Sequence, residues 1–274
     1  MSGFAPAWLE LREPFDRMAR SADLLHRFAR WSASRSRLAI VDLGSGTGSN
    51  LRALAGALSC ARSWTLVEHD PALIAAGTAA LAKSGMATKA AYARLDLAHH
   101  LAKAISEGTG LVTASAFLDL VSASWLDELA ALVLERRAAL YLTLTYSGDL
   151  CWQPGAELDR EVQLLFDAHQ RTDKGFGPAL GPAAARALEA RLALGPGELH
   201  AGASDWRLGP GDRAIQTALL EGYARAATEL APARAAAIAG WRDERMRHIE
   251  AGRSTHRVGH VDLLWLPDRE LAGR

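Results

Sequence analysis

Apolar residues along this chain fall into two recurring patterns, short continuous runs and longer stretches at helical spacing. Continuous apolar runs are typical of buried parallel strands, whereas apolar residues three or four positions apart predict amphipathic helices. The runs cover residues 38–41, 63–67, 90–94, 111–120 and 138–146. Because helical patterns separate them, the alternation predicts five strands of one doubly wound sheet with right-handed crossovers.

The remaining segments depart from this alternation. Residues 7–30 carry a helical stripe, and Pro14 predicts a split into two helices because proline lacks a backbone N–H. Beyond the fifth run we expect helices over 157–170 and 182–193, a strand over 198–208, helices over 211–229 and 232–251, and a last strand over 258–266.

These elements together predict an α/β fold. We expect a mostly parallel seven-stranded sheet with helices on both faces, an antiparallel last strand and helical cap insertions. The chain then divides into a helical arm over residues 1–35 and one α/β domain over 36–274. The caps span about 147–180 and 211–251.

Composition narrows the class of protein. The 274 residues hold 31 basic and 31 acidic side chains, so the net charge is zero and a nucleic-acid surface is not expected. No apolar run is long enough to span a bilayer. Cys60 and Cys151 lie far apart and suit neither a metal site nor a disulfide framework. We therefore expect a cytoplasmic protein that binds no metal and forms a monomer or a homodimer.

The stretch over residues 38–58 holds the most informative motif. An apolar strand ends in Asp42, and Gly44, Gly46 and Gly48 follow before a helical pattern begins. Glycines let the backbone turn sharply and let a ligand approach it closely. A dinucleotide-binding loop needs a sixth-position glycine, where this chain has Ser49. The loop therefore disfavours a dinucleotide and leaves open which nucleotide-like ligand binds.

The Asp-x-Gly-x-Gly-x-Gly pattern resembles the first motif of class I S-adenosylmethionine (SAM) dependent methyltransferases. The resemblance covers residues 38–146 and, loosely, the final strands. It implies SAM as cofactor, S-adenosyl-L-homocysteine as product, and a Rossmann-like SAM-binding domain over residues 36–274. In that family a helical arm before the first strand often covers the cofactor; packing of the arm on the sheet is the alternative here.

Acids at later strand ends extend the resemblance. Glu68 stands where the family has a carboxylate for the ribose hydroxyls, and Asp96 where it often has an Asp for the adenine amino group. A carboxylate suits a diol because its two oxygens accept two hydrogen bonds. The full cofactor-binding set implied is Asp42, Gly44, Ser45, Gly46, Gly48, Asn50, Glu68, His69, Asp96, Leu97, Ser115 and Ala116.

The acceptor side is less defined. Asp119 stands where the family often has a His, so Asp119 and His169 are the candidates for a catalytic base. The first cap begins at the carboxyl end of the fifth strand, so we expect it to lie beside the cofactor and to form the acceptor pocket. The predicted acceptor-binding residues are Tyr146, Trp152, Phe166 and Gln170. His256 and His260 flank the last strand and are expected to be structural.

The predicted function is methyl transfer from SAM to an oxygen or nitrogen of a small molecule. The tetrapeptide Asn/Asp-Pro-Pro-Tyr/Phe is absent, which disfavours N-methylation of nucleic-acid bases. Two alternatives stay open: an NAD(P)-dependent oxidoreductase, and a non-catalytic module that keeps the SAM-binding fold.

Overall fold

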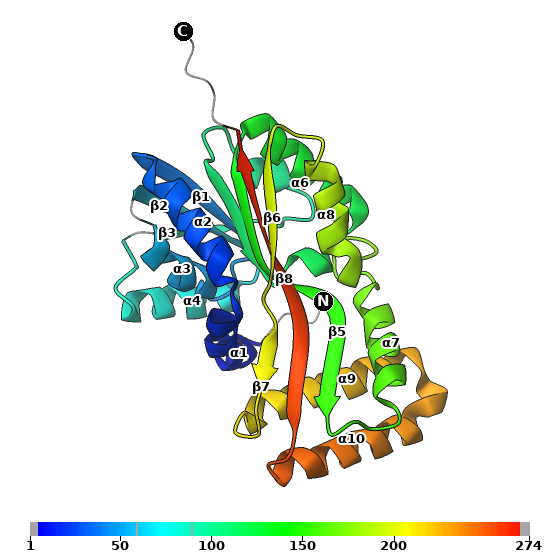
Figure 1. The fold of residues 1–274 in the computed structure, drawn as a ribbon. Helices are drawn as coiled ribbons and strands as arrows, with labels where there is room; N and C mark the ends of the chain where they lie inside the picture. Colours follow the sequence, from blue (N-terminus) through cyan, green and yellow to red (C-terminus); the bar gives the residue numbers. More distant parts are fainter. Residues whose placement is uncertain (1–4, 59, 89, 269–274) are drawn as a thin grey trace.

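The computed structural model describes residues 5–58, 60–88 and 90–268, and its strands form one mixed sheet (Figure 1). The strands are β1 (Arg37–Leu43), β2 (Ala61–Glu68), β3 (Ala90–Arg94), β4 (Leu111–Ser115), β5 (Ala139–Gln153), β6 (Gly197–Ala203), β7 (Trp206–Leu208) and β8 (Thr255–Pro267). Their order is β3-β2-β1-β4-β5-β8-β6, and β7 pairs with β8. The first five strands are parallel, and β8 is antiparallel to β5, β6 and β7. The predicted α/β fold with a mostly parallel sheet and an antiparallel last strand is confirmed.

Helices cover both faces of the parallel strands. They are α1 (Pro6–Ala19), α2 (Ala22–Ala33), α3 (Ser49–Leu54), α4 (Pro71–Lys83), α5 (Leu101–Ala104), α6 (Ala123–Arg136), α7 (Asp159–Gln170), α8 (Ala184–Leu192), α9 (Arg213–Leu230) and α10 (Ala235–Glu250). Among the described ranges, none of these helices combines the length and apolar character needed to cross a membrane.

The alternation of β1 side chains shows why the sheet carries two cores. Leu38 and Ile40 join the core under α2, α3 and α4, whereas Val41 and Leu43 join the core under α5, α6 and α8. Successive strand residues point to opposite faces, so a strand buried on both faces must be apolar throughout. The parallel strands therefore form a rigid platform whose carboxyl ends meet at one edge.

The two longest strands continue past that platform. The β5–β8 pairing runs from Leu140 opposite Trp265 to Gln153 opposite Thr255, with register shifts on the way. Beyond the first shift, residues 145–153 and 255–261 form a two-stranded extension joined by β7. Figure 1 shows α7, α9 and α10 gathered around this end of β5 and β8. We call this part, with its helices, the extension.

A strained residue marks the point where the extension begins. Leu144 lies in a β-bulge of β5 with φ of 58° although it is fully buried. Its backbone N–H donates to Asp262 Oδ1 at 2.8 Å, and Ser21 N, at the start of α2, donates to Asp262 Oδ2 at 2.9 Å. The buried carboxylate thus holds the bulge and anchors the helical arm, which offsets the cost of a left-handed leucine.

Two local predictions were wrong. Pro14 does not split the arm: α1 is continuous, and the break falls at Arg20–Ser21, where Ser21 Oγ accepts from Leu24 N and caps α2. The proline removes one helical hydrogen bond, which the tertiary contacts of α1 outweigh. The single strand expected over residues 198–208 is interrupted at residues 204–205 and forms β6 and β7, which pair with β8 in one continuous register.

Candidate functional site

A cavity of about 430 Å³ opens at the carboxyl edge of the parallel strands. Its wall includes Asp42, Glu68, Asp96 and Ser115. Asp42 is the second-last residue of β1, Glu68 and Ser115 end β2 and β4, and Asp96 lies two residues after β3. Ligands of open α/β sheets bind at this edge, where the strand order reverses. The fold thus brings four polar groups from separate strands to a single hollow.

The glycine loop forms the floor of this cavity. Gly44 has φ of 59°, and a Cβ built there would lie 2.5 Å from the Phe117 ring, a distance no side chain tolerates. Gly46 has φ of 52°, and its added Cβ would approach Leu9 of α1 at 3.1 Å. Both positions need left-handed backbone in a tight space, so the loop is built for glycine and leaves its backbone open to a ligand.

Asp42 is the most unusual charged group in the wall. It is 1% exposed, and Asn50 Nδ2 donates to its Oδ1 at 2.7 Å. Asn50 also donates to Thr113 Oγ1 at 3.0 Å, which fixes the amide. Within the described residues, Asp42 Oδ2 has no hydrogen-bond partner. Burial raises the pKa of Asp42 to about 7, against the lowering effects of Asn50 and Arg20. A cationic ligand group would satisfy this oxygen and favour the ionised form.

Glu68 is already engaged by the backbone. Its Oε2 accepts from Gly46 N at 3.0 Å, and its Oε1 accepts from His69 N at 2.8 Å and Asp70 N at 3.0 Å. A carboxylate has about four acceptor positions, so roughly one remains, on Oε2. The side chain thus pins the glycine loop to the end of β2. It has capacity for a single further donor rather than for both hydroxyls of a diol.

Asp96 and Ser115 complete the row of strand ends. Asp96 Oδ1 accepts from Ala98 N at 2.9 Å, and its half-exposed side chain, with Oδ2 4.0 Å from His99 Nε2, lines the cavity. Ser115 Oγ accepts from Arg20 Nη2 at 3.4 Å, and Arg20 Nη1 donates to Thr143 Oγ1 at 3.0 Å. Burial lowers the pKa of Arg20, although nearby acids oppose the shift. Arg20 thus ties the arm to the end of β4 and to Thr143 within β5.

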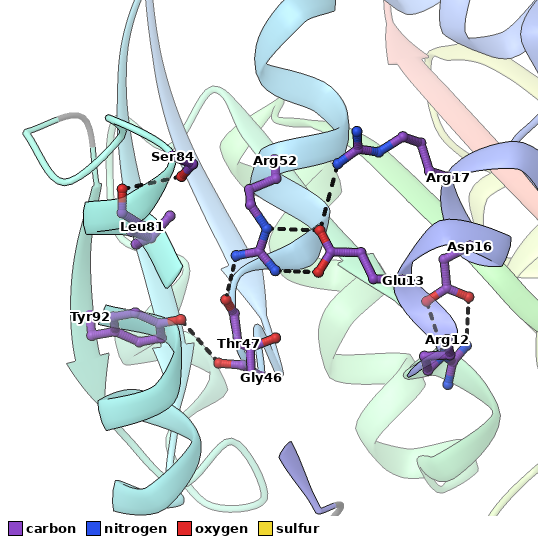
Figure 2. A network of polar contacts seen from close by, with 10 residues as sticks. All are labelled: Arg12, Glu13, Asp16, Arg17, Gly46, Thr47, Arg52, Leu81, Ser84 and Tyr92. Carbon is purple, nitrogen blue, oxygen red and sulfur yellow. Dashed lines mark hydrogen bonds and ion pairs between the residues drawn. The ribbon is translucent and has the colours of Figure 1, made fainter. Parts of the chain in front are cut away.

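The helical arm forms the opposite wall. Leu9, Arg12 and Asp16 of α1 line the cavity, so α1 borders the site. Figure 2 shows how it is held: the Arg52 guanidinium donates to the Glu13 carboxylate, with Nε to Oε1 at 2.8 Å, and Nη1 donates to the Thr47 carbonyl at 2.7 Å. One guanidinium therefore joins the arm to the glycine loop.

The same close-up shows two further contacts around the loop. Tyr92 OH donates to the Gly46 carbonyl at 3.0 Å, and Arg12 pairs with Asp16 within α1 at 2.9 Å (Figure 2). The Arg12 guanidinium also lies 4.8 Å from the Trp206 ring centre, and Trp206 Nε1 donates to Asp16 at 3.1 Å. The charges of α1 at the cavity are thus already neutralised by one another.

Most residues expected to bind the cofactor do line the cavity. These are Asp42, Gly44, Ser45, Gly46, Asn50, Glu68, His69, Asp96, Leu97, Ser115 and Ala116. Gly48 does not; it stands before α3 with φ of 77°. Their cofactor roles stay predictions. Sequence analysis expected the arm and the first cap near the cofactor but missed Arg12, Asp16, Phe117, Lys174 and Phe176, because no local pattern shows which side chains reach this edge.

The two candidate bases lie behind the wall. Asp119 belongs to the short 3-10 turn Leu118–Leu120 and is 7% exposed. Burial raises its pKa to about 6, opposed by backbone N–H groups of Asp119 and Tyr146 and by the charge of Arg12. His169 reaches the cavity indirectly, since its Nδ1 lies 3.3 Å from Nζ of the wall residue Lys174. Their catalytic roles stay predictions.

The four residues predicted to bind the acceptor lie elsewhere, and none lines this cavity. Tyr146 OH donates to Asp167 Oδ1 at 2.8 Å, and the Tyr146 ring packs against Phe166. Trp152 stacks on His256 at 3.6 Å inside the extension. Gln170 is half-buried beside Gly181. These are surroundings of a packed interior, so a role in acceptor binding stays a prediction.

The described residues contain no group of three or more His, Cys, Asp or Glu side chains that could hold a metal ion. His256 and His260 behave as buried neutral groups, because burial lowers the pKa of each to about 3. His256 Nε2 lies 3.2 Å from Tyr223 OH, and its Nδ1 lies 3.1 Å from the Cys151 carbonyl. These contacts fit the structural role expected of His256.

Comparison with known proteins shows similarity to solved structures in fold. No family model matches the chain, and no curated protein matches it. YjhP from E. coli matches with a TM-score of 0.49 and 14% identity, over 96% of this chain and 100% of that one. Geranyl diphosphate C-methyltransferase from Streptomyces coelicolor A3(2), solved with Mg²⁺, geranyl-S-thiolodiphosphate and S-adenosyl-L-homocysteine, matches with a TM-score of 0.43 and 11% identity, over 89% and 75%.

The [4+2]-cyclase SpnF matches with a TM-score of 0.45 and 14% identity, over 93% of this chain and 82% of that one. The matches thus span most of the chain and include methyltransferases that act on small molecules. At these identities and scores they leave the function to be inferred from the cavity itself.

Proposed function

We propose that this protein is a SAM-dependent methyltransferase that moves a methyl group to an oxygen or nitrogen of a small molecule. One observation carries the proposal: Asp42, Glu68, Asp96 and Ser115, from the ends of four adjacent strands, line one cavity. The same four positions resemble the cofactor-binding series of that family. Polar groups converging on one largely apolar hollow are typical of a ligand site.

The chemistry of the wall fits SAM. SAM carries two positive groups near one end, the α-ammonium and the sulfonium, and Asp42 Oδ2 is a buried carboxylate oxygen without a partner among the described residues. A buried unpaired acceptor is costly, so a cationic group there is favourable. Asp42 would hold the ammonium, the remaining acceptor position of Glu68 one ribose hydroxyl, and Asp96 the adenine amino group.

When bound, SAM supplies an electrophilic methyl group on a positively charged sulfur. The chain's own task is to orient the reactants and exclude water. The glycine loop fixes one side, and α1 with Leu9 and the rings of Phe117 and Phe176 close the other. Holding two reactants in line can supply about 7–11 kcal/mol of the barrier. Aromatic faces near a sulfonium add cation–π attraction.

The acceptor is proposed to be a compact molecule. A cavity of about 430 Å³ lies in the range of small-ligand sites, and the zero net charge does not favour a nucleic acid. A base is needed only if the acceptor must lose a proton to react. Asp119, with its raised pKa of about 6, and His169 remain the candidates for that role.

Equilibrium binding tests this proposal. Isothermal titration of the purified protein with SAM, S-adenosyl-L-homocysteine and NAD is expected to show binding of the first two and none of NAD. The missing sixth-position glycine of the loop is the reason to expect no NAD binding. If NAD binds and neither SAM nor S-adenosyl-L-homocysteine does, the result would support an oxidoreductase and contradict the proposal.

A second assay separates an enzyme from a non-catalytic module. Incubation with methyl-labelled SAM and a small-molecule extract of the source cells is expected to transfer label to a compound that mass spectrometry identifies. Tight SAM binding with no labelled product from any extract would favour the non-catalytic alternative.

A further inference from the structure

One loop of the cavity wall carries a positive charge that the proposed function has not used. Asp173 Oδ1 accepts from Gly175 N at 2.6 Å and Gly177 N at 3.0 Å, which folds the loop over residues 173–177 into a compact turn. The Phe176 ring packs edge-on against Phe117 at 5.4 Å and Trp125 at 5.7 Å between ring centres. The turn is therefore fixed to the wall, and Lys174 lies beside this aromatic anchor.

A chain of three side chains positions the Lys174 amino group. Glu229 Oε2 of α9 lies 3.0 Å from His169 Nε2 of α7, so the carboxylate accepts a hydrogen bond from the Nε2–H group. His169 Nδ1 is then left as an acceptor, 3.3 Å from Lys174 Nζ. Lys174 Nζ also donates to Thr172 Oγ1 at 2.9 Å. An ammonium has three donors, so two are used and one remains for a ligand.

The charge of Lys174 has no direct counter-ion. No carboxylate of the described residues forms a salt bridge with Lys174; Glu229 is separated from it by the His169 ring. The other strong cation of the cavity wall, Arg12, is paired with Asp16. Burial lowers the pKa of Lys174 while Glu229 raises it, as expected for a half-buried ammonium stabilised through an imidazole. Lys174 is thus a preorganised cation at the edge of an apolar surface.

We propose that Lys174 binds a carboxylate of the methyl acceptor, so that the acceptor class is a small, partly apolar carboxylic acid. This inference rests on the proposed function. Phe117, Leu120 and Phe176 line the cavity with Lys174 and suit the apolar body of such a molecule. SAM also carries a carboxylate, which is an alternative ligand for Lys174. The experiment must therefore distinguish binding of the cofactor carboxylate from binding of the acceptor carboxylate.

The first part of the experiment measures the affinity for the cofactor in two lysine variants. Lys174→Met keeps the length of the side chain and removes its charge, and Lys83→Met removes an exposed lysine at the end of α4 as the matched control. Both variants are expected to melt like the parent protein and to bind SAM and S-adenosyl-L-homocysteine with unchanged affinity. A loss of about tenfold or more in SAM affinity for Lys174→Met alone would assign the lysine to the cofactor and overturn the inference.

The second part of the experiment tests whether the site prefers a carboxylate to a neutral amide of the same shape. Benzoate and its neutral counterpart benzamide are titrated by NMR into the protein saturated with S-adenosyl-L-homocysteine. The parent and Lys83→Met are expected to bind benzoate about tenfold tighter than benzamide, because a charge-assisted hydrogen bond exceeds a neutral one. Lys174→Met is expected to lose that preference. Equal binding of the two probes by the parent, or a preference that survives in Lys174→Met, contradicts the inference.

The two proposals fail in different ways. If S-adenosyl-L-homocysteine does not bind the parent protein, the proposed function is wrong and the inference falls with it. If S-adenosyl-L-homocysteine binds but benzoate shows no advantage, the methyltransferase proposal stands and the acceptor class is wrong.

Discussion

The cavity edge of the sheet and the extension both bury charged side chains, but they treat them differently. In the extension Arg245 is fully buried, its Nε donates to Asp159 Oδ1 at 2.9 Å, and Trp241 Nε1 donates to the same oxygen at 2.8 Å. At the cavity edge Asp42 is buried with an oxygen that no described residue satisfies. A buried charge with a partner is stabilised within the fold, whereas a buried charge without one is costly until a ligand of opposite charge binds it.

The surroundings of the two groups support this contrast. Arg245 also lies over the Trp152 ring at 5.5 Å, and Trp152 stacks on His256, so the buried charge of the extension is surrounded by side chains that contact it. Glycines with left-handed backbone and a cavity of about 430 Å³ surround Asp42. Stability and binding are therefore concentrated in different halves of the fold, and substitutions should separate them.

The largest expected effect lies in the extension. Arg245→Met removes the buried guanidinium that pairs with Asp159, so the free energy of unfolding should fall by about 3 kcal/mol. We expect the low end of the range for broken buried pairs because Asp159 is partly exposed and keeps its hydrogen bond from Trp241. Urea unfolding measures this loss. Arg242→Met, which breaks a solvent-exposed pair with Asp243, is the control and should leave the free energy of unfolding nearly unchanged. Equal losses for the two variants would mean that the extension is not held by its buried pair.

Next comes Asp42→Asn at the cavity. The amide keeps the shape of the side chain and removes the charge, so SAM affinity should fall about 30-fold, as expected for the loss of a hydrogen bond between two charged groups. Isothermal titration with SAM measures it. An affinity equal to that of the parent would show that Asp42 faces no cation.

The pH dependence of the same group sharpens this prediction. Because the pKa of Asp42 is raised to about 7 without ligand, SAM must displace a proton below pH 7, and affinity should fall by up to about tenfold per unit as pH decreases. The free protein should show the opposite trend: the stability contributed by protonated Asp42 is present below its unfolded pKa of 3.8 and is lost as pH rises through 7. In Asp42→Asn the pH dependence of SAM affinity should be absent and the stability trend weaker, because buried Asp119, whose pKa is also raised, still contributes to that trend.

A smaller loss is expected at Glu68. Glu68→Ala removes the acceptor for three backbone N–H groups and one predicted ribose contact, so SAM affinity should fall about tenfold. Calorimetric titration of the variant with SAM tests it. Unchanged affinity would rule out both the ribose contact and the anchoring of the loop.

The smallest effect concerns the arm. Glu13→Gln weakens the partly buried pair with Arg52 that joins α1 to the glycine loop, so SAM should dissociate about two- to threefold faster, as suits a pair worth about 0.5 kcal/mol. Stopped-flow displacement of SAM measures this rate. Asp23→Asn, which removes an exposed pair on α2, is the control and should leave the rate unchanged.

The sequence by itself determined the platform and its polar edge. The continuous apolar runs gave β1 to β5 within a few residues at most ends, because burial on both faces demands apolar residues at successive positions. Asp42, Glu68 and Asp96 each lie within two residues of the carboxyl end of their strand, so the parallel order sufficed to bring them to one edge. Local pattern and chain direction encode these features.

Only the tertiary structure decided what faces that edge. The β5–β8 extension depends on pairing between residues about a hundred positions apart, and the loop with Lys174 reaches Phe117 through a turn and an aromatic contact. Likewise α1 meets the glycine loop through Glu13 and Arg52, 39 residues apart. Such contacts depend on how the packed elements fit together in three dimensions, so the periodicity of the sequence does not predict them.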